Sequence, residues 1–441
     1  AICGRRLSGH AVSGMSLDTD EDLSKQFEES LSRLTGDLSS KSLLLAVSGG
    51  SDSMALMHLT AVWAKARGVK CSVVTVDHGL RAESAIEAEF VKSAAQGLGL
   101  THKTLRWKGA ERSGNLQMNA REARYRLIAS HRAEHDMVLT GHTLEDQAET
   151  FLLRLRRGSG VDGLSAIPEK RYVTAGEGGY WLIRPMLDLQ RDRLRKFLKQ
   201  RFIEWVDDPS NDDIRFDRVK MRHALAHLSD LGINAKNIAE TSRHLQRARA
   251  ALDQQTGLFA QEFCKTEHGD LLIDRAEFQK PHSELQYRLI SSALKWVSSN
   301  PYRPRFSTLT FALEGVLSGK TQSLHGCLVR VHKNEIRITR EFNAVAKTKM
   351  DLEDGAIWDG RWKFHCANGQ TLPDLFIAPL GPMGATWARH ESGSMLPHRS
   401  LQCHPGVFNE NGIVYAPSLI ENKHVSVTFC AKPFVPDLGS Y

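Results

Sequence analysis

Apolar and polar residues follow one another in the first half of the chain in a pattern typical of α/β proteins. Three short apolar segments have the length of buried strands, at 43–47, 71–76 and 137–140. A helical pattern follows each of these segments, at 54–67, 85–98 and 144–157. Because such alternation builds a parallel sheet covered by helices on both faces, we expect this architecture near the N-terminus. Ligands of such sheets bind at the carboxyl ends of the strands, so the loops after the three strands are candidate site positions.

The remaining sequence divides into two further parts. From 226 to 344 the pattern is mostly helical, with a strand or hairpin at 328–338. From 345 to 441 short strand-like segments lie among glycines and prolines, which indicates a small β-rich or α+β domain. We therefore expect a Rossmann-like α/β domain at 20–225 followed by these two parts. Residues 1–19 show no secretory signal, and we expect them to be disordered.

The composition is that of a water-soluble protein of several domains. The chain has 441 residues, of which 41% are hydrophobic and 25% are charged. Because no apolar run reaches the ~20 residues that a membrane-spanning helix needs, we expect a cytoplasmic protein without a membrane partner. The seven cysteines are scattered without a C-x-x-C pair, which fits free thiols in a reducing compartment and argues against a structural zinc site.

Positive charge is concentrated in one segment of the chain. The formal net charge is +7, and residues 151–222 contain 16 Lys and Arg against 11 Asp and Glu. This segment therefore carries most of the excess charge. A basic segment of this kind is typical of a surface that binds nucleic acid, although a solvated basic face is the simpler alternative.

The most specific motif follows the first predicted strand and opens the helix after it. Its glycines let the backbone turn tightly, and consecutive N–H groups at the start of a helix form a cradle for an anion. Serine hydroxyls can contact phosphate oxygens, and Asp52 can hold Mg²⁺. The motif is neither a Walker A loop nor a Rossmann G-x-G-x-x-G sequence. Six residues are therefore predicted to bind phosphate groups: Ser48, Gly49, Gly50, Ser51, Asp52 and Ser53.

Polar residues also follow the other two predicted strands. Asp77 and His78 end the second strand, where they can lie beside a nucleotide or simply form a polar turn. After the third strand, His142 precedes a helix that carries Asp146 and Glu149. These two carboxylates are three residues apart and share a helix face, where they repel each other unless a cation or an ammonium group joins them. A plain acidic surface patch is the alternative interpretation.

Taken in order, these elements resemble the PP-loop of the N-type ATP pyrophosphatases and, more narrowly, the tRNA(Ile)-lysidine synthetases. Four further segments support the narrower resemblance, at 119–125, 155–164, 184–186 and 208–222. The resemblance covers residues from about 40 to 225 and is weak beyond them. The chain departs from the family pattern after Arg218, where Val219 stands in place of the usual Asn.

The resemblance implies a two-step reaction on the wobble cytidine of an isoleucine tRNA with a CAU anticodon. ATP adenylates the base at O2 and pyrophosphate leaves; the ε-amine of free L-lysine then displaces AMP at C2. The resemblance also implies ATP and Mg²⁺ as cofactors. Residues 20–225 would form the catalytic domain and 226–344 a tRNA-binding domain.

The resemblance further implies roles for individual residues. Asp52 would hold Mg²⁺ and, together with His142, would serve catalysis, while Asp77 and His78 would lie near the adenosine. Three residues would bind the lysine substrate: Arg121, Asp146 and Glu149. Five arginines would contact the RNA backbone: Arg156, Arg157, Arg184, Arg218 and Arg222.

Two other kinds of protein remain open at this point. A tRNA thiolase is also a PP-loop enzyme, but thiolases often carry paired cysteines and this chain lacks a C-x-x-C sequence. A catalytically inactive RNA-binding protein would not need Asp52 or the pair of carboxylates. The sequence does not decide the oligomeric state, and a homodimer is one option.

Overall fold

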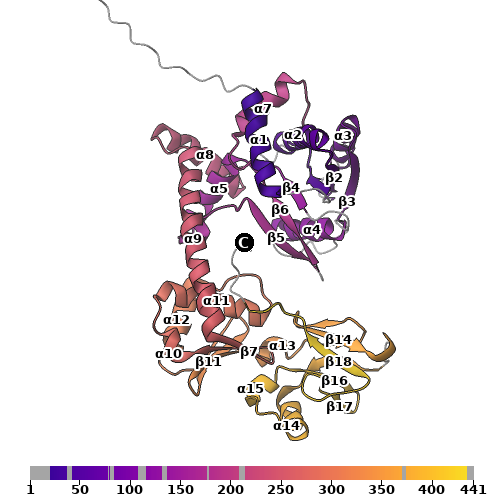
Figure 1. The fold of residues 1–441 in the computed structure, drawn as a ribbon, viewed down its shortest axis with the longest axis vertical. Helices are drawn as coiled ribbons and strands as arrows, with labels where there is room; N and C mark the ends of the chain where they lie inside the picture. The colour runs from indigo at the N-terminus through magenta and orange to yellow at the C-terminus, as the bar shows by residue number, and fades with distance from the viewer. Residues whose placement is uncertain are drawn as a thin grey trace, which may run out of the picture. The chain divides into compact units, whose positions relative to one another are not determined.

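The computed structural model describes residues 20–36, 42–77, 79, 84–107, 116–131, 137–175, 178–207, 214–369 and 374–434. The chain forms two compact units, and the boundary between them falls after Arg249 (Figure 1). We refer to the part before this boundary as unit 1 and to the part after it as unit 2. The N-terminal segment 1–19, which we expect to be disordered, lies outside the described residues.

A six-stranded sheet forms the centre of unit 1, in the order β3-β2-β1-β4-β6-β5. Its strands are β1 (Ser42–Ala46), β2 (Lys70–Asp77), β3 (Thr101–Arg106), β4 (Met137–Thr140), β5 (Lys170–Ala175) and β6 (Gly178–Ile183). The pairs β1–β2, β1–β4, β2–β3 and β4–β6 are parallel, whereas β5 runs antiparallel to β6. The predicted α/β class with an N-terminal parallel sheet is therefore confirmed.

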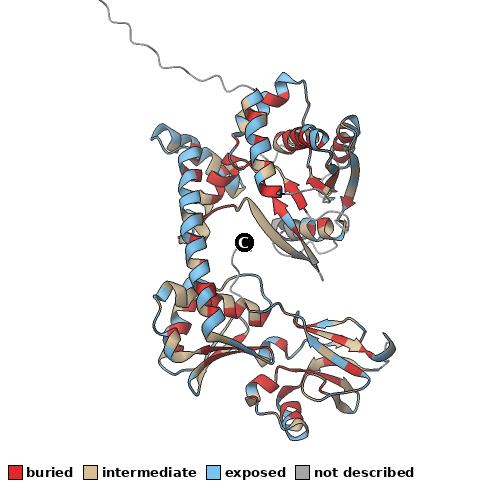
Figure 2. Cartoon of the chain, viewed as in Figure 1, coloured by how far each residue is buried: buried red, intermediate tan, exposed pale blue. Residues whose placement is uncertain are grey.

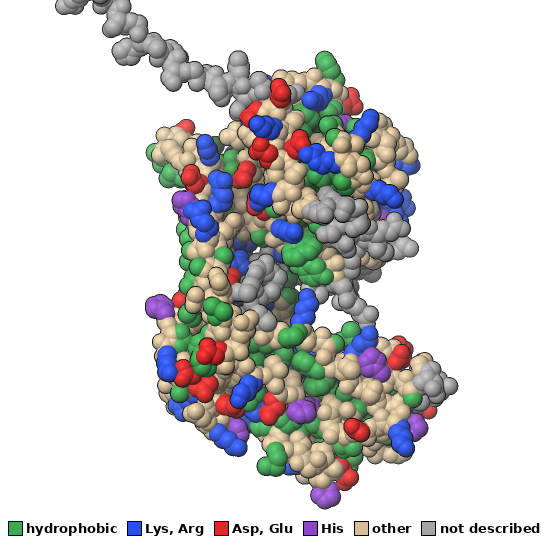
Figure 3. Space-filling view, viewed as in Figure 1, with side chains coloured by type: hydrophobic (Ala, Val, Ile, Leu, Met, Phe, Trp, Pro, Cys, Tyr) green, Lys and Arg blue, Asp and Glu red, His purple; other side chains and the backbone are tan. Residues whose placement is uncertain are grey.

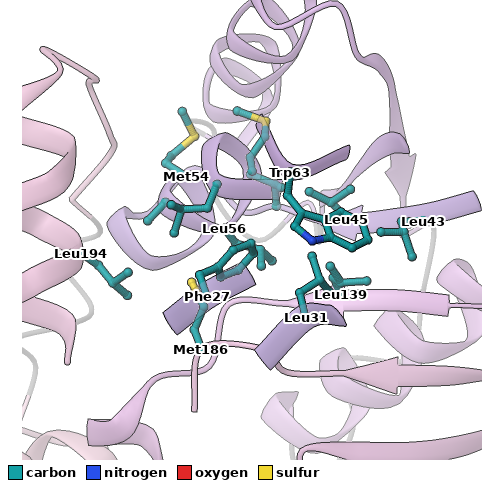
Figure 4. Packing of buried hydrophobic residues seen from close by; sticks show 14 of the residues in the cluster. Phe27, Leu31, Leu43, Leu45, Met54, Leu56, Trp63, Leu139, Met186 and Leu194 are labelled. Carbon is teal, nitrogen blue, oxygen red and sulfur yellow. The ribbon is translucent and has the colours of Figure 1, made fainter. Parts of the chain in front are cut away.

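Helices cover both faces of this sheet. Alternate residues of β1 point to opposite faces, so its apolar side chains pack against helices on each side. Leu43 and Leu45 belong to a core with residues of α1, α2, α3 and α7, whereas Leu44 packs in a second core that includes Ile128 of α4. Figure 4 shows Phe27 packed among the residues of the first core. The helices are α1 (Asp20–Thr35), α2 (Ser51–Arg67), α3 (Ser84–Gly97), α4 (Leu116–His131) and α7 (Arg191–Gln200). Each fully buried large apolar side chain stabilises the fold by roughly 1.5–3 kcal/mol.

The order of the strands places a topological switch point at the carboxyl ends of β1 and β4. The chain adds β2 and β3 on one side of β1 and then returns to add β4 on the other side. The loops that leave β1 and β4 therefore diverge, and such a switch point is where open α/β sheets bind ligands. The phosphate-loop motif and the segment that contains His142 lie at this point.

Three helices extend from this edge of the sheet. They are α5 (Leu144–Leu155), α8 (Asp217–Asp230) and α9 (Ala235–Phe263), with the short α6 (Val161–Leu164) after α5. Ala148, Leu225 and Ile238 contribute one residue from each of the three long helices to a small apolar cluster. This packing holds α8 beside α5.

A five-stranded antiparallel sheet, in the order β7-β8-β11-β10-β9, occupies the first part of unit 2. Its strands are β7 (Cys264–Glu267), β8 (Asp270–Asp274), β9 (Gln322–Leu324), β10 (Cys327–His332) and β11 (Glu335–Arg340). The helices of this part are α10 (Arg275–Phe278), α11 (Ser283–Ser298) and α12 (Phe306–Leu317). A strand or hairpin was expected at 328–338, and the structure has a hairpin there, formed by β10 and β11. β7 and β8 were not predicted, because they are short and lie between helical patterns.

Small antiparallel sheets make up the rest of unit 2. One has the order β12-β15-β16-β17 and the other the order β13-β14-β18. Their strands are β12 (Met350–Asp351), β13 (Ile357–Trp358), β14 (Trp362–Cys366), β15 (Phe376–Pro379), β16 (Pro405–Asn409), β17 (Gly412–Tyr415) and β18 (Val425–Phe429). The helices are α13 (Phe342–Val345), η2 (Ala367–Gly369), α14 (Gly381–Ser392) and α15 (His398–Leu401). Figure 2 shows buried residues along many of the strands in both units. Among the described residues, no helix is both long and apolar enough to cross a membrane.

Candidate active site

The phosphate-loop motif forms a tight turn between β1 and α2. Gly49 has φ of +93°, a value that strains any residue with a side chain. The Ser48 amide donates a hydrogen bond to Ser53 Oγ at 3.2 Å, and Ser53 Oγ donates to the Gly50 carbonyl at 2.9 Å. Gly50 is the N-cap of α2 and supplies no side chain to cap the first turn. The positive end of the helix is therefore left for an anion.

The loop after β4 lies directly against the start of α2. A Cβ atom added to Gly141 would lie 3.0 Å from the carbonyl oxygen of Asp52 and 3.1 Å from the amide nitrogen of Ser53. Only a glycine lets the two backbones approach this closely without a shift. The phosphate loop and the loop that carries His142 are therefore neighbours, as their positions at the strand ends predict.

Two buried carboxylates project from the first turns of α5. Asp146 Oδ2 accepts hydrogen bonds from the amide of Thr143 at 2.9 Å and from its hydroxyl at 3.1 Å, which forms a capping box. Glu149, only 1% exposed, accepts a hydrogen bond from Arg222 Nε through Oε1 at 3.0 Å. Its other oxygen, Oε2, is buried and has no hydrogen-bond partner within the described part of the chain. A buried carboxylate oxygen in this state is suited to receive a cationic ligand.

Arg191, the first residue of α7, joins these carboxylates to the phosphate loop. Its Nε atom donates to Asp52 Oδ2 at 2.9 Å, and Nη2 lies 3.4 Å from Asp146 Oδ2. Nη1 lies 3.6 Å from Glu149 Oε1. The sequence did not point to this residue. Arg191 lies in the basic segment 151–222, but nothing in the sequence pattern distinguished it from Arg193.

Burial and charge act in opposite directions on the acidic groups of the site. Burial raises the pKa of Asp52, and the guanidinium of Arg191 opposes that rise. Burial also disfavours the ionised form of Asp146, but the nearby charges of His142, Arg191 and Arg218 hold its pKa below the ordinary value. For Arg191, the three carboxylates outweigh burial and raise its pKa, so the guanidinium stays charged.

Other predicted residues occupy the edges of this site or lie outside the described residues. His142 Nδ1 is 3.0 Å from Thr140 Oγ1, and Asp77 Oδ1 accepts a hydrogen bond from the Gly79 amide at 2.9 Å. The structure does not describe His78 or the side chain of Arg121. Val219 is 4% exposed in α8, so the position where the family usually has an Asn is part of the apolar packing here.

The arginines predicted to contact RNA have different surroundings. Arg156, near the end of α5, pairs with Asp217 at 2.6 Å, and both side chains are exposed. Arg157 is exposed, and Arg218 lies 3.8 Å from Asp146 Oδ1. Figure 3 shows basic and acidic side chains mixed on this part of unit 1. In contrast, Arg184 is 2% exposed and donates to the Pro168 carbonyl at 2.6 Å.

The phosphate loop at a switch point of a parallel sheet defines the class of the protein. A family profile described as "PP-loop domain" matches residues 23–228, which include the whole site described above. The chain is therefore a PP-loop protein.

Proteins with similar sequences narrow the assignment from the PP-loop class to one family. The chain is 40% identical to the tRNA(Ile)-lysidine synthase of Ruegeria pomeroyi over 85% of its own length and 87% of the relative. It is 35% identical to the enzyme of that name from Wolbachia pipientis wMel, over 76% of this chain and 79% of the relative. Among solved structures, the U34-tRNA thiolase NcsA from Methanococcus maripaludis matches 51% of this chain and 80% of its own, with a TM-score of 0.42 and 16% identity. The chain belongs to the tRNA(Ile)-lysidine synthase family, as its motifs predict.

Proposed function

We propose that the protein is an ATP-dependent ligase that joins free lysine to C2 of the wobble cytidine in an isoleucine tRNA with a CAU anticodon. The observation that carries this proposal is that Arg191 bridges the phosphate loop and two buried carboxylates at one sheet edge. The site can thus hold a nucleotide beside a cationic amine. The name of the relatives, tRNA(Ile)-lysidine synthase, supports the RNA substrate. We place the reaction in the cytoplasm, where tRNA, ATP and lysine occur together.

The phosphate loop suits the terminal phosphates of ATP. The backbone N–H groups in the first turn of α2 offer donors to phosphate oxygens, because no side chain caps this turn. The hydroxyls of Ser48, Ser51 and Ser53, which donate hydrogen bonds within the loop, would turn toward the phosphates when the nucleotide binds. Mg²⁺ would neutralise charge on the phosphates as pyrophosphate leaves. Asp52 would hold that ion through its carboxylate.

The two carboxylates of α5 suit the ammonium groups of lysine. Glu149 offers the buried oxygen without a hydrogen-bond partner, and Asp146 lies one turn nearer to the phosphate loop. Arg121 would bind the carboxylate of the amino acid. His142, at the junction of the two loops, would contact the phosphates or the adenylate.

The two steps follow from the chemistry of cytosine. The C2 carbonyl is a weak electrophile with a poor leaving group, and attachment of AMP to O2 provides a good one. The attacking ε-amine must lose its proton before it can act as a nucleophile. A base must take up this proton as the amine attacks, and exclusion of water at that moment would protect the adenylated base from hydrolysis.

The basic residues near the start of α8 would position the RNA. Arg156, Arg157, Arg218 and Arg222 lie on or next to α5 and α8, at the border of the proposed lysine site. Contacts of this kind orient an RNA backbone without reading its sequence. We leave Arg184 out of this interface because its side chain is buried against the Pro168 carbonyl.

Release of pyrophosphate without lysine tests the first step. The protein should release pyrophosphate from Mg²⁺·ATP only when a CAU-anticodon isoleucine tRNA is present. Asp52→Asn should lower this rate about a hundredfold or more, because it removes the charge that holds the metal. Circular dichroism should show that the variant remains folded. Release at the same rate without tRNA, or an active Asp52→Asn variant, would contradict the proposal.

A further inference from the structure

One guanidinium contacts carboxylates that the proposed function assigns to two different substrates. Asp52 belongs to the phosphate loop, whereas Asp146 and Glu149 belong to the proposed amine site on α5. Arg191 reaches all three, at 2.9, 3.4 and 3.6 Å. Its side chain is 15% exposed, so solvent screens these interactions less than it screens a surface ion pair.

The backbone holds Arg191 firmly at this position. Its amide donates a hydrogen bond to Glu145 Oε2 at 2.9 Å, and the Leu144 amide donates to the Leu189 carbonyl at 3.0 Å. Leu194, one turn further along α7, is fully buried in the main core of unit 1. The start of α7 is therefore tied to the start of α5 and to the core beneath the phosphate loop.

The shape of the side chain matters as well as its charge. A guanidinium is a rigid planar fork whose N–H groups point in several fixed directions, whereas a lysine ammonium is a point charge on a flexible stem. Only the fork can hold an oxygen of Asp52 while facing Asp146 and Glu149. Its positive charge also offsets the repulsion among the three carboxylates before any substrate cation binds.

We propose that Arg191 is a positioning residue for both steps of the reaction. It orients Asp52 toward the metal–nucleotide complex and holds Asp146 and Glu149 at the distance that lysine requires. The ATP site and the amino-acid site thereby keep a fixed distance and orientation relative to each other. This inference rests on the proposed function, because that function assigns the carboxylates to two substrates.

The same helix provides a matched control. Arg193 lies two residues further along α7, pairs with Asp22 at 3.0 Å and is 17% exposed. It resembles Arg191 in charge and in its own burial, but Asp22 lies on α1 and outside the proposed site. Arg193→Gln therefore reports the effect of removing an ion-paired arginine from this helix outside the site.

The test compares Arg191→Lys and Arg191→Gln with Arg193→Gln in the full-length protein. Thermal unfolding, pyrophosphate release without lysine, and the lysine KM for tRNA modification are measured for each. Arg191→Gln should slow pyrophosphate release and raise the lysine KM, each by about tenfold to a hundredfold. Arg191→Lys should recover part of both losses, because it restores the charge without the fork. Arg193→Gln should leave both activities at the wild-type value.

A purely structural role gives a different result. It predicts that a folded Arg191→Lys protein has the wild-type pyrophosphate rate and lysine KM, and this outcome overturns the inference. If Arg191→Gln does not fold, Arg191→Lys alone decides the question.

A binding measurement separates this inference from the proposed function. If the wild type shows no tRNA-dependent pyrophosphate release, the proposed function fails whatever the variants do. The dissociation constant of a non-hydrolysable Mg²⁺·ATP analogue then still tests the contact between Arg191 and Asp52. It should rise about tenfold in folded Arg191→Gln or Arg191→Lys protein. Unchanged affinity in both variants overturns the inference.

Discussion

The buried oxygen of Glu149 gives the sharpest test at the scale of a single residue. Glu149→Gln keeps the size of the side chain but removes the charge that would pair with an ammonium group. Because hydrogen bonds to charged groups contribute about 1.5–3 kcal/mol, the lysine KM should rise about tenfold or more. Pyrophosphate release in the absence of lysine should change much less. The measurement is the lysine dependence of tRNA modification.

A control for this prediction is Glu169→Gln, which removes an acid that pairs with Arg33 outside the site. An unchanged lysine KM in Glu149→Gln would assign the amine to another position. Asp146→Asn is a less direct test, because Asp146 also caps α5 through Thr143. A loss of activity in that variant could come from the lost lysine contact or from a less stable start of α5.

The sequence predicted those parts of the site whose residues lie close together along the chain. Asp146 and Glu149 share a helix face at a spacing of three, and the phosphate loop is a continuous motif. Arg191, in contrast, lies 139 residues from Asp52, with which it forms a hydrogen bond. Only the packing of α7 on the core brings the two together, and no local pattern reports such a contact.

At the scale of elements, the exposed end of α5 and the start of α8 carry the proposed RNA contacts. Arg157 is exposed there, so Arg157→Ala should weaken tRNA binding without affecting the fold. Loss of a phosphate contact should also lower the slope of log affinity against log salt concentration by about one. The measurement is a titration of tRNA binding at several salt concentrations.

Lys92→Ala is the matched control, since Lys92 lies on α3 outside the basic segment and pairs with Glu89. Its salt slope should equal that of the wild type. If Arg157→Ala also shows the wild-type slope, the RNA backbone does not contact Arg157.

Burial explains which strands the sequence could predict. β1 and β4 are central strands, and their apolar residues are visible as short runs. β3 is an edge strand with a single buried residue, Leu105, so its sequence shows no apolar run. β7 has no fully buried residue and was missed for the same reason. Burial is not the whole reason, because β8 was also missed although it is an inner strand with four buried residues. Its apolar run is short and follows a long helix, so the sequence does not separate it from the helical pattern.

At the scale of the whole molecule, buried ion pairs hold the parts of unit 2 together. Asp359 Oδ2 accepts hydrogen bonds from Arg340 Nε at 3.0 Å and from Arg361 Nη2 at 2.9 Å. Arg340 ends β11, whereas Asp359 and Arg361 belong to the turn before β14. A truncation after Val345 would remove Asp359 and Arg361 but leave Arg340 without its partner. A substitution at Asp359 therefore disturbs unit 2 less than a truncation does.

Asp359→Asn should destabilise unit 2 by about 3–5 kcal/mol, because it leaves two largely buried guanidinium groups without their shared carboxylate. The asparagine tolerates the left-handed backbone at this residue, where φ is +50°, so the change acts mainly through charge. Calorimetry should show earlier unfolding of unit 2. The exposed Glu421→Gln substitution serves as a control.

The same variant tests whether unit 2, which contains most of the predicted tRNA-binding region 226–344, contributes to tRNA binding. Nucleotide binding should remain normal in Asp359→Asn, since the site lies in unit 1. Above the unfolding temperature of the altered unit, affinity for the isoleucine tRNA should fall. Wild-type affinity under those conditions would mean that unit 2 does not contribute to tRNA binding.

The mass of the tRNA after reaction tests the central claim most directly. A CAU-anticodon isoleucine tRNA incubated with the protein, Mg²⁺, ATP and lysine should gain the mass of one lysine less one water. The gain should disappear when either ATP or lysine is omitted. A methionine tRNA with the same anticodon should keep its mass. An unchanged isoleucine tRNA, or a gain that corresponds to sulfur, would contradict the account.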